Sequence, residues 1–142
     1  MKLFNTLNIS ASGLTAERLR LDIVANNIAN ASTTRSPDGG PYQKRAAVFK
    51  EKLSRELNSN GRTYETKGVE VGAIVRDQSP PKMVYNPNHP DADEKGFVAM
   101  PNVDLVIEMA DMITATRGYE ANVTVLNATK AMALKALEIG RG

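Results

Sequence analysis

Apolar residues recur at spacings of three and four along the first 30 residues of the chain. The repeated positions are Phe4, Leu7, Ala11, Leu14, Arg18, Leu21, Ala25 and Ile28, and Arg18 alone among them is not apolar. This heptad-like spacing predicts a helix. The helix formers give way to three asparagines and then to a Ser- and Thr-rich run before Pro37, which ends the pattern. We therefore expect an N-terminal helix within residues 1–32.

A second periodic pattern runs from Asn102 to Ile139. Its apolar line passes through Leu105, Met109, Met112, Thr116, Tyr119, Val123, Leu126, Lys130, Ala133 and Leu137. A neighbouring line passes through Val125, Ala128, Met132 and Ala136. Pro101 and Asn102 supply a start signal, and early acidic residues suit the positive end of a helix. The pattern predicts a long helix within residues 102–142 that has apolar side chains on more than one face.

The region between the helices, residues 33–101, has a different pattern and holds all seven prolines. Short runs typical of strands occur at 46–49, 69–75 and 82–85. The last two are separated by Gln78-Ser79-Pro80-Pro81, which predicts a hairpin between them. The middle is therefore expected to be a small β-hairpin unit with long loops.

These parts predict a mainly α protein. Its long N- and C-terminal helices pair antiparallel in a coiled-coil-like manner, with the hairpin region at one end. One helix pair cannot cover several apolar stripes, and long uncovered stripes indicate association with other subunits.

Composition narrows the function classes. The 18 Lys and Arg residues against 16 Asp and Glu give a net charge of +2, which argues against nucleic-acid binding. Cysteine is absent and histidine occurs once, so thiolate sites and sites with two imidazoles are excluded. No apolar run reaches 18 residues, and the N-terminus lacks the layout of a cleaved secretory signal. If the protein leaves the cytoplasm, it must use another route.

Candidate chemistry is sparse. His89, Asp91, Asp93 and Glu94 could suit a divalent cation, but the segment lacks the spacing of a calcium loop, and its prolines favour a rigid turn. Gly39-Gly40 lacks the Lys-Ser/Thr of a phosphate-binding loop. The single histidine leaves Ser and Thr side chains without a base. We expect no enzyme activity, no cofactor, no metal and no small-molecule substrate.

Several motifs resemble those of bacterial flagellar rod and hook proteins. The opening helix does so through Ile9-Ser10-Ala11-Ser12-Gly13-Leu14 and through 21–30, which reads LDIVANNIAN. The segments 33–42, 84–93 and 96–103 are similar to the proximal rod proteins of the FlgC type, as is the closing helix through 115–122 and 132–138. The resemblance covers nearly the whole chain, apart from residues 50–66.

The resemblance implies a structural subunit of the rod, the drive shaft that carries torque from motor to hook around a protein-export channel. It also implies a place in the flagellar basal body and export by the flagellar type III apparatus without a cleaved signal. Expected partners are further copies, other rod proteins, the protein at the export-gate junction and the membrane-ring protein. A cytoplasmic regulatory helical dimer is the alternative.

For a rod subunit, the apolar lines become the expected assembly interface. Its predicted members are Leu7, Leu14, Leu21, Ala25, Ile28, Met109, Met112, Tyr119, Val123, Leu126, Met132 and Leu137. The amides of Asn26, Asn27 and Asn30 are either helix-end residues or polar contacts to the channel or to other subunits.

Overall fold

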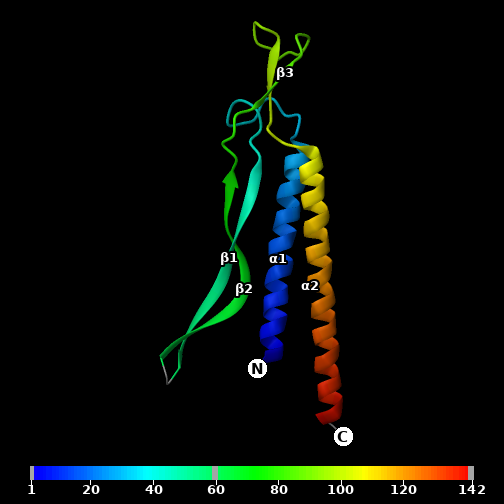
Figure 1. Ribbon diagram of the computed structural model, residues 1–142. Helices are drawn as coiled ribbons and strands as arrows, with labels where there is room; N and C mark the ends of the chain where they lie inside the picture. The colour runs from blue at the N-terminus through cyan, green and yellow to red at the C-terminus, as the bar shows by residue number, and fades with distance from the viewer. Residues whose placement is uncertain (1, 59–60, 141–142) are drawn as a thin grey trace.

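The computed structural model describes residues 2–58 and 61–140, with side chains described for 4–53 and 67–140. In chain order the elements are α1 (Lys2–Ala29), β1 (Arg45–Asn58), β2 (Gly61–Arg76), β3 (Lys82–Tyr85), β4 (Phe97–Met100) and α2 (Leu105–Gly140). Figure 1 shows an elongated molecule in which α1 and α2 lie side by side and the β1–β2 hairpin runs along α1. β3 lies beyond the end of the helix pair where α1 ends and α2 begins. The expected two long terminal helices around a β-containing middle are confirmed.

The sequence signals place the helix ends well. Asp104 precedes α2, and its Oδ1 accepts hydrogen bonds from the backbone N–H groups of Val106 (2.9 Å) and Ile107 (3.3 Å). These two donors belong to the first turn, where no carbonyl of the helix itself is available. In the described part of the chain, neither helix combines the length and the apolar character needed to cross a membrane.

The predicted pairing of 69–75 with 82–85 is wrong. Residues 69–75 belong to β2, which pairs antiparallel with β1 from Arg45↔Arg76 to Asn58↔Gly61, while β3 pairs with β4. The β1 strand is much longer than the run 46–49 that the pattern indicated, because charged residues from Lys50 onward interrupt its alternation. The middle therefore contains two separate hairpins, and the larger one is a 14- and 16-residue ribbon rather than a small unit.

Small and polar side chains, rather than the predicted apolar lines, lie where α1 meets α2. A Cβ added at Gly13 would lie 2.9 Å from Asn122 Nδ2, and one at Gly118 would lie 3.3 Å from the Glu17 carboxylate. Arg20 Nη2 lies 3.4 Å from Asp111 Oδ1. These contacts fall one position away from the predicted lines through Leu14, Leu21, Tyr119 and Val123. The close approach of the two helix backbones requires small residues such as Gly13 and Gly118 at the contact, because larger side chains would hold the helices apart.

Ser12 of α1 holds the middle of the β1–β2 hairpin against the helix. The Ser12 hydroxyl accepts a hydrogen bond from Val69 N–H (3.1 Å) and donates one to the Ile9 carbonyl (2.7 Å). Gly68, with φ of +105°, allows this approach, since a Cβ there would lie 2.0 Å from Ser12 Oγ. Register shifts at Val48/Phe49 and Glu51/Leu53 bend the ribbon. Beyond this level the ribbon diverges from the helices (Figure 1).

Candidate functional site

The twelve side chains predicted to form an assembly interface remain accessible in the single subunit. Five of them are exposed, namely Ala25, Met109, Tyr119, Met132 and Leu137. The other seven are half-buried, namely Leu7, Leu14, Leu21, Ile28, Met112, Val123 and Leu126. The fully buried positions of α1 lie elsewhere, at Ser10, Ala16, Ile23, Val24 and Asn27. The periodicity therefore marks side chains that the chain does not bury by itself.

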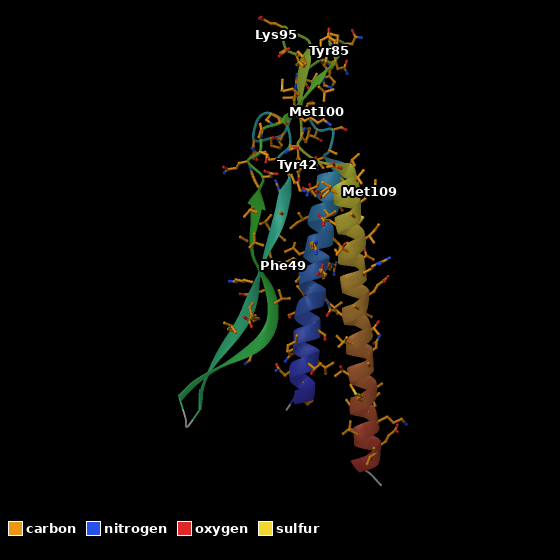
Figure 2. All side chains as sticks on the ribbon, in the orientation of Figure 1. Tyr42, Phe49, Tyr85, Lys95, Met100 and Met109 are labelled. Atoms are coloured by element: carbon orange, nitrogen blue, oxygen red, sulfur yellow. The ribbon has the colours of Figure 1, made fainter. Side chains whose placement is uncertain are left out.

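Exposed apolar side chains continue along α2 beyond the predicted set. We call the following residues the α2 apolar surface: Leu105, Val106, Ile107, Met109, Ile113, Val125, Met132, Leu134, Leu137 and Ile139. Their exposed fractions range from 43% at Val125 to 80% at Ile139. Figure 2 shows Met109 near the start of α2, level with the last turns of α1. Single exposed apolar residues are common, but a row of this length along one helix indicates contact with other molecules.

The last turns of α2 have no partner helix. Gly13 faces Asn122 and Asn27 contacts Glu108, and this register places the start of α1 opposite about residue 133 of α2. The helix continues to Gly140 and carries Leu134, Leu137 and Ile139, all more than half exposed. Figure 1 shows α2 extending past the N-terminal end of α1. In the described part of the chain these side chains are left uncovered and are available to another molecule.

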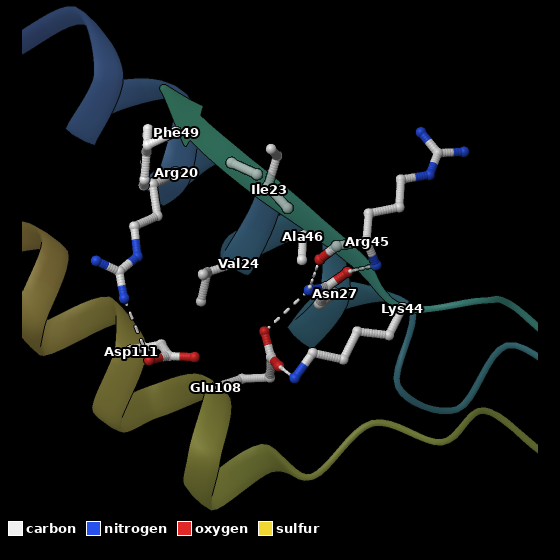
Figure 3. A pocket seen from close by; sticks show the side chains of 11 residues that line it. Arg20, Ile23, Val24, Asn27, Lys44, Arg45, Ala46, Phe49, Glu108 and Asp111 are labelled. Atoms are coloured by element: carbon white, nitrogen blue, oxygen red, sulfur yellow. Dashed lines mark hydrogen bonds and ion pairs between the residues drawn. The ribbon is translucent and has the colours of Figure 1, made fainter. Parts of the chain in front are cut away.

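Asn27 is the centre of a polar cluster that joins α1, α2 and the start of β1 (Figure 3). Its exposed fraction is 1%, and its amide uses all four of its hydrogen-bonding positions. Nδ2 donates to the Arg45 carbonyl (2.8 Å) and to Glu108 Oε2 (2.9 Å). Oδ1 accepts from Arg45 N–H (2.9 Å) and from the Tyr42 hydroxyl (2.9 Å). We call Asn27, Tyr42, Lys44, Arg45 and Glu108 the Asn27 cluster.

Glu108 brings a buried carboxylate into the cluster. Its side chain is 1% exposed, and Lys44 Nζ lies 2.5 Å from Oε1. A buried carboxylate is tolerated only when it is compensated, and here Asn27 donates a hydrogen bond to Oε2 while the Lys44 ammonium forms an ion pair with Oε1. Glu108 is one of the early acidic residues of α2 that were interpreted through the helix dipole, and its buried contacts with Lys44 and Asn27 were missed. The spacing of 81 residues between Asn27 and Glu108 gives no local signal for the contact.

Tyr42 closes the cluster on the side away from α2. Burial raises the pKa of its hydroxyl, the nearby Glu108 carboxylate acts in the same direction, and Arg45 opposes both. The neutral hydroxyl therefore persists as a donor to Asn27. Below the cluster, a cavity of about 320 Å³ lies between α1, α2 and β1, and Ile23, Val24 and Phe49 contribute its apolar lining.

Asn26, Asn27 and Asn30, near the end of α1, differ in burial and in hydrogen-bond partners. Asn27 uses all four of its hydrogen-bonding positions within its own chain. Asn30 Nδ2 donates to the Asn26 carbonyl and to Asn26 Oδ1, both at 2.9 Å, in the last turn of α1. Asn26 is exposed and Asn30 is half-buried, so intersubunit contacts by these two stay a prediction.

The segment His89–Glu94 forms a turn in which the carboxylates of Asp91 and Asp93 are hydrogen-bonded by other groups. Asp91 accepts from Thr34 Oγ1 (2.7 Å) and Arg35 Nε (2.5 Å). Asp93 Oδ1 accepts from the N–H groups of Lys95 (2.9 Å) and Phe97 (2.8 Å). The His89 ring nitrogen Nδ1 accepts from Asp91 N–H (3.1 Å). These bonds tie the turn before β4 to the segment after α1.

Replacing Asp91 with Asn should loosen that tie. The hydrogen bond from Thr34, followed by that from Arg35, lowers the pKa of the Asp91 carboxyl. The stabilisation is therefore present above the carboxyl's ordinary pKa and is lost as the pH falls through its lower value in the fold. Hydrogen exchange at neutral pH should be faster in residues 33–42 of Asp91→Asn, and the difference from the parent should vanish in acid. Asp77→Asn is the control, since the Asp77 carboxylate accepts hydrogen bonds from the N–H and hydroxyl of nearby Ser79.

Two helices joined through small and polar residues, with apolar side chains facing outward, define a subunit that completes its packing inside an assembly. Residues 7–35 match the family model of the flagella basal body rod protein, and residues 94–139 match that of the C-terminal part of flagellar basal body rod FlgEFG proteins. The chain is similar to the flagellar basal-body rod protein FlgC of Borreliella burgdorferi, with 46% identity over the whole of both chains. It is 45% identical to FlgC of Bacillus subtilis and 44% identical to FlgC of Escherichia coli O6:H1, covering 99% of this chain and 100% of each relative. The chain belongs to the FlgC family of flagellar basal-body rod proteins.

This membership confirms the expected family and the expected role. The chain is a structural subunit of the flagellar basal-body rod, and it is placed in the flagellar basal body together with other rod components. The alternative of a cytoplasmic regulatory dimer is not favoured, because these relatives are named as rod proteins.

Proposed function

We propose that this protein forms the proximal part of the rod, carries torque from the motor toward the hook, and surrounds the protein-export channel. In this proposal residues 1–32 and 102–142 act together as an antiparallel, coiled-coil-like unit of the axial core, and residues 33–101 form the middle region. Partners are further copies, other rod proteins, the export-gate junction protein and the membrane-ring protein. The chain reaches the rod through the flagellar type III apparatus without a cleaved signal, and it has no enzymatic activity.

The observation that carries the proposal is the α2 apolar surface. Its side chains are between 43% and 80% exposed in the single subunit, and the last turns of α2 extend past α1. Burial of one such leucine contributes about 1.5–3 kcal/mol. An assembly that repeats this contact in every copy gains that free energy many times, which suits a shaft that must resist torsion.

A test replaces Leu137, which is 66% exposed, with aspartate. The variant should be produced and exported but should not assemble, because a carboxylate placed in an apolar interface adds a desolvation penalty to the lost burial. The measurements are swimming, basal bodies counted by electron microscopy, and secreted protein, in a strain lacking the native copy. Met132→Asp tests the other exposed apolar side of α2, because the two positions are five residues apart and do not share a face, and it should also fail to assemble.

The matched control is Gln78→Asp, which adds the same charge in the exposed loop after β2. It should swim like the parent. Normal swimming of Leu137→Asp and Met132→Asp would show that α2 does not form an assembly surface, and the proposal would then be wrong.

A further inference from the structure

Two arginines lie directly opposite one another at the base of the β1–β2 hairpin. Arg45 pairs with Arg76 in the ladder, and the backbone bond from Asp77 N–H to the Lys44 carbonyl (2.8 Å) belongs to the neighbouring pair. Arg45 and Arg76 thus form a pair without mutual backbone hydrogen bonds, the type in which side chains are closest. Like charges at directly opposed positions destabilise a sheet. Folding of the hairpin therefore does not explain this pair.

The local charges are unbalanced. Arg76 Nη1 forms an ion pair with Asp38 Oδ2 at 2.7 Å. In the described part of the chain, the Arg45 guanidinium has no carboxylate partner and lies over the Tyr42 ring, 6.0 Å from its centroid. The site consequently holds two guanidinium groups and one carboxylate, which pairs with Arg76 alone. Figure 3 shows the Arg45 side chain directed away from Lys44 and Glu108, so the buried carboxylate of the Asn27 cluster does not neutralise it.

The site is hollow and is held in place. A cavity of about 610 Å³ is lined by Arg45, Arg76, Asp38, Tyr42, Asn26 and other residues of the 36–43 loop. The Asn27 amide hydrogen-bonds both the N–H and the carbonyl of Arg45 and so fixes its backbone. The same amide accepts a hydrogen bond from Tyr42, whose ring lies under the Arg45 guanidinium. A guanidinium positioned in this way is suited to a bidentate bond with a carboxylate.

We propose that the Arg45–Arg76 pocket docks an acidic side chain of a neighbouring copy of this chain in the rod. This inference rests on the proposed function. Charge complementarity identifies the occupant, because the chain carries exposed carboxylates whose oxygens have neither a cationic partner nor a hydrogen bond among its described residues. These are Asp22, Glu51, Glu94 and Glu120. The α2 apolar surface supplies most of the burial, and the pocket fixes how neighbouring copies are oriented.

The first test is Arg45→Glu in a strain that lacks the native copy. Inside one subunit this change replaces a repulsive Arg–Arg pair by an attractive Glu–Arg pair, and the Asn27 bonds go to the backbone of residue 45, so the hairpin is retained. Between subunits it opposes two carboxylates. Basal bodies should fall at least about tenfold while secreted protein stays at the parent level. Lys82→Glu, the same charge reversal on exposed β3, should have no effect.

The second test asks which acid is bound. Within the Arg45→Glu strain, each of Asp22, Glu51, Glu94 and Glu120 is changed in turn to Arg. Restored basal bodies with one of these changes would support the contact between copies. Failure of all four to restore assembly would overturn it, as would normal swimming of Arg45→Glu. Loss of assembly in Leu137→Asp together with normal Arg45→Glu would remove the pocket from the account and leave the proposed function standing.

Discussion

Replacing Asn27 with aspartate should abolish rod assembly, although only one atom of the side chain changes in kind. The amide nitrogen now donates to the Arg45 carbonyl and to Glu108 Oε2, at 2.8 and 2.9 Å. A carboxylate oxygen in its place would face two acceptors, one of them charged, at a position that is 1% exposed. Each buried polar group left unsatisfied costs about 1–3 kcal/mol, and a charged one costs more. The cluster must therefore open, or one carboxyl must take up a proton.

Swimming and basal-body counts measure the effect on assembly, and hydrogen exchange of the start of β1 measures it locally. The control is Asn8→Asp, which makes the same change at an exposed position of the same helix, away from the cluster. A second variant combines Asn27→Asp with Glu108→Gln, which returns a donor to the pair and should restore part of the function. Parental swimming by Asn27→Asp alone would show that the cluster does not position the hairpin.

The second large effect is expected from Gly68→Val. The backbone there has φ of +105°, which side-chain-bearing residues rarely adopt, and a Cβ would lie 2.0 Å from Ser12 Oγ and 3.3 Å from Ile9 Cα. Rotation of the Ser12 hydroxyl would not relieve the clash, because Ser12 Cβ, at 3.0 Å, and Ile9 Cα are fixed by the helix backbone, so the hairpin must leave α1. The bond between Ser12 and Val69 is lost as well. We expect secreted protein but almost no basal bodies.

Two comparisons isolate the cause of that effect. Ser12→Ala removes the hydrogen bond without a clash and should cost only about 1 kcal/mol, so its motility should be reduced slightly or not at all. Gly72→Ala adds a Cβ that meets only the flexible side chain of Lys50 at 3.0 Å, and should be nearly neutral. If Gly68→Val assembled as well as Gly72→Ala, the close approach of β2 to α1 would not be required in the rod.

The helices were predictable because their signals are local. Apolar spacing identifies both, and Asp104 with the preceding Pro101 and Asn102 marks the start of α2 to within a few residues. The same spacing identified side chains that are not fully buried in the subunit, such as Leu126 and Leu137, although it gave no information on what covers them. The faces by which α1 and α2 touch were missed, because Gly13, Glu17 and Gly118 carry no apolar signal.

The hairpin pairing could not be predicted for a related reason. The two prolines after Ser79 indicate a turn, and a turn between two apolar runs is typical of a hairpin. The actual partner of 69–75 lies in a strand rich in Lys, Glu and Arg, whose propensity is low and whose pairing depends on α1 beside it. Asn27 was interpreted either as a residue at a helix end or as a contact to the channel or to other subunits, since nothing near it in the sequence shows that Arg45 and Glu108 lie within reach.

The two contacts between α1 and the hairpin also bear on aggregation. An outer strand edge presents unpaired N–H and C=O groups, to which a strand from a second chain can add. At Arg45 the Asn27 amide takes both groups of the β1 edge, and at Val69 the Ser12 hydroxyl takes the N–H group of the β2 edge. Because the ribbon twists, one helix reaches the edge of each strand in turn (Figure 1). Subunits at high concentration are thus hindered, at these two points, from pairing edge to edge through their hairpins before they join the rod.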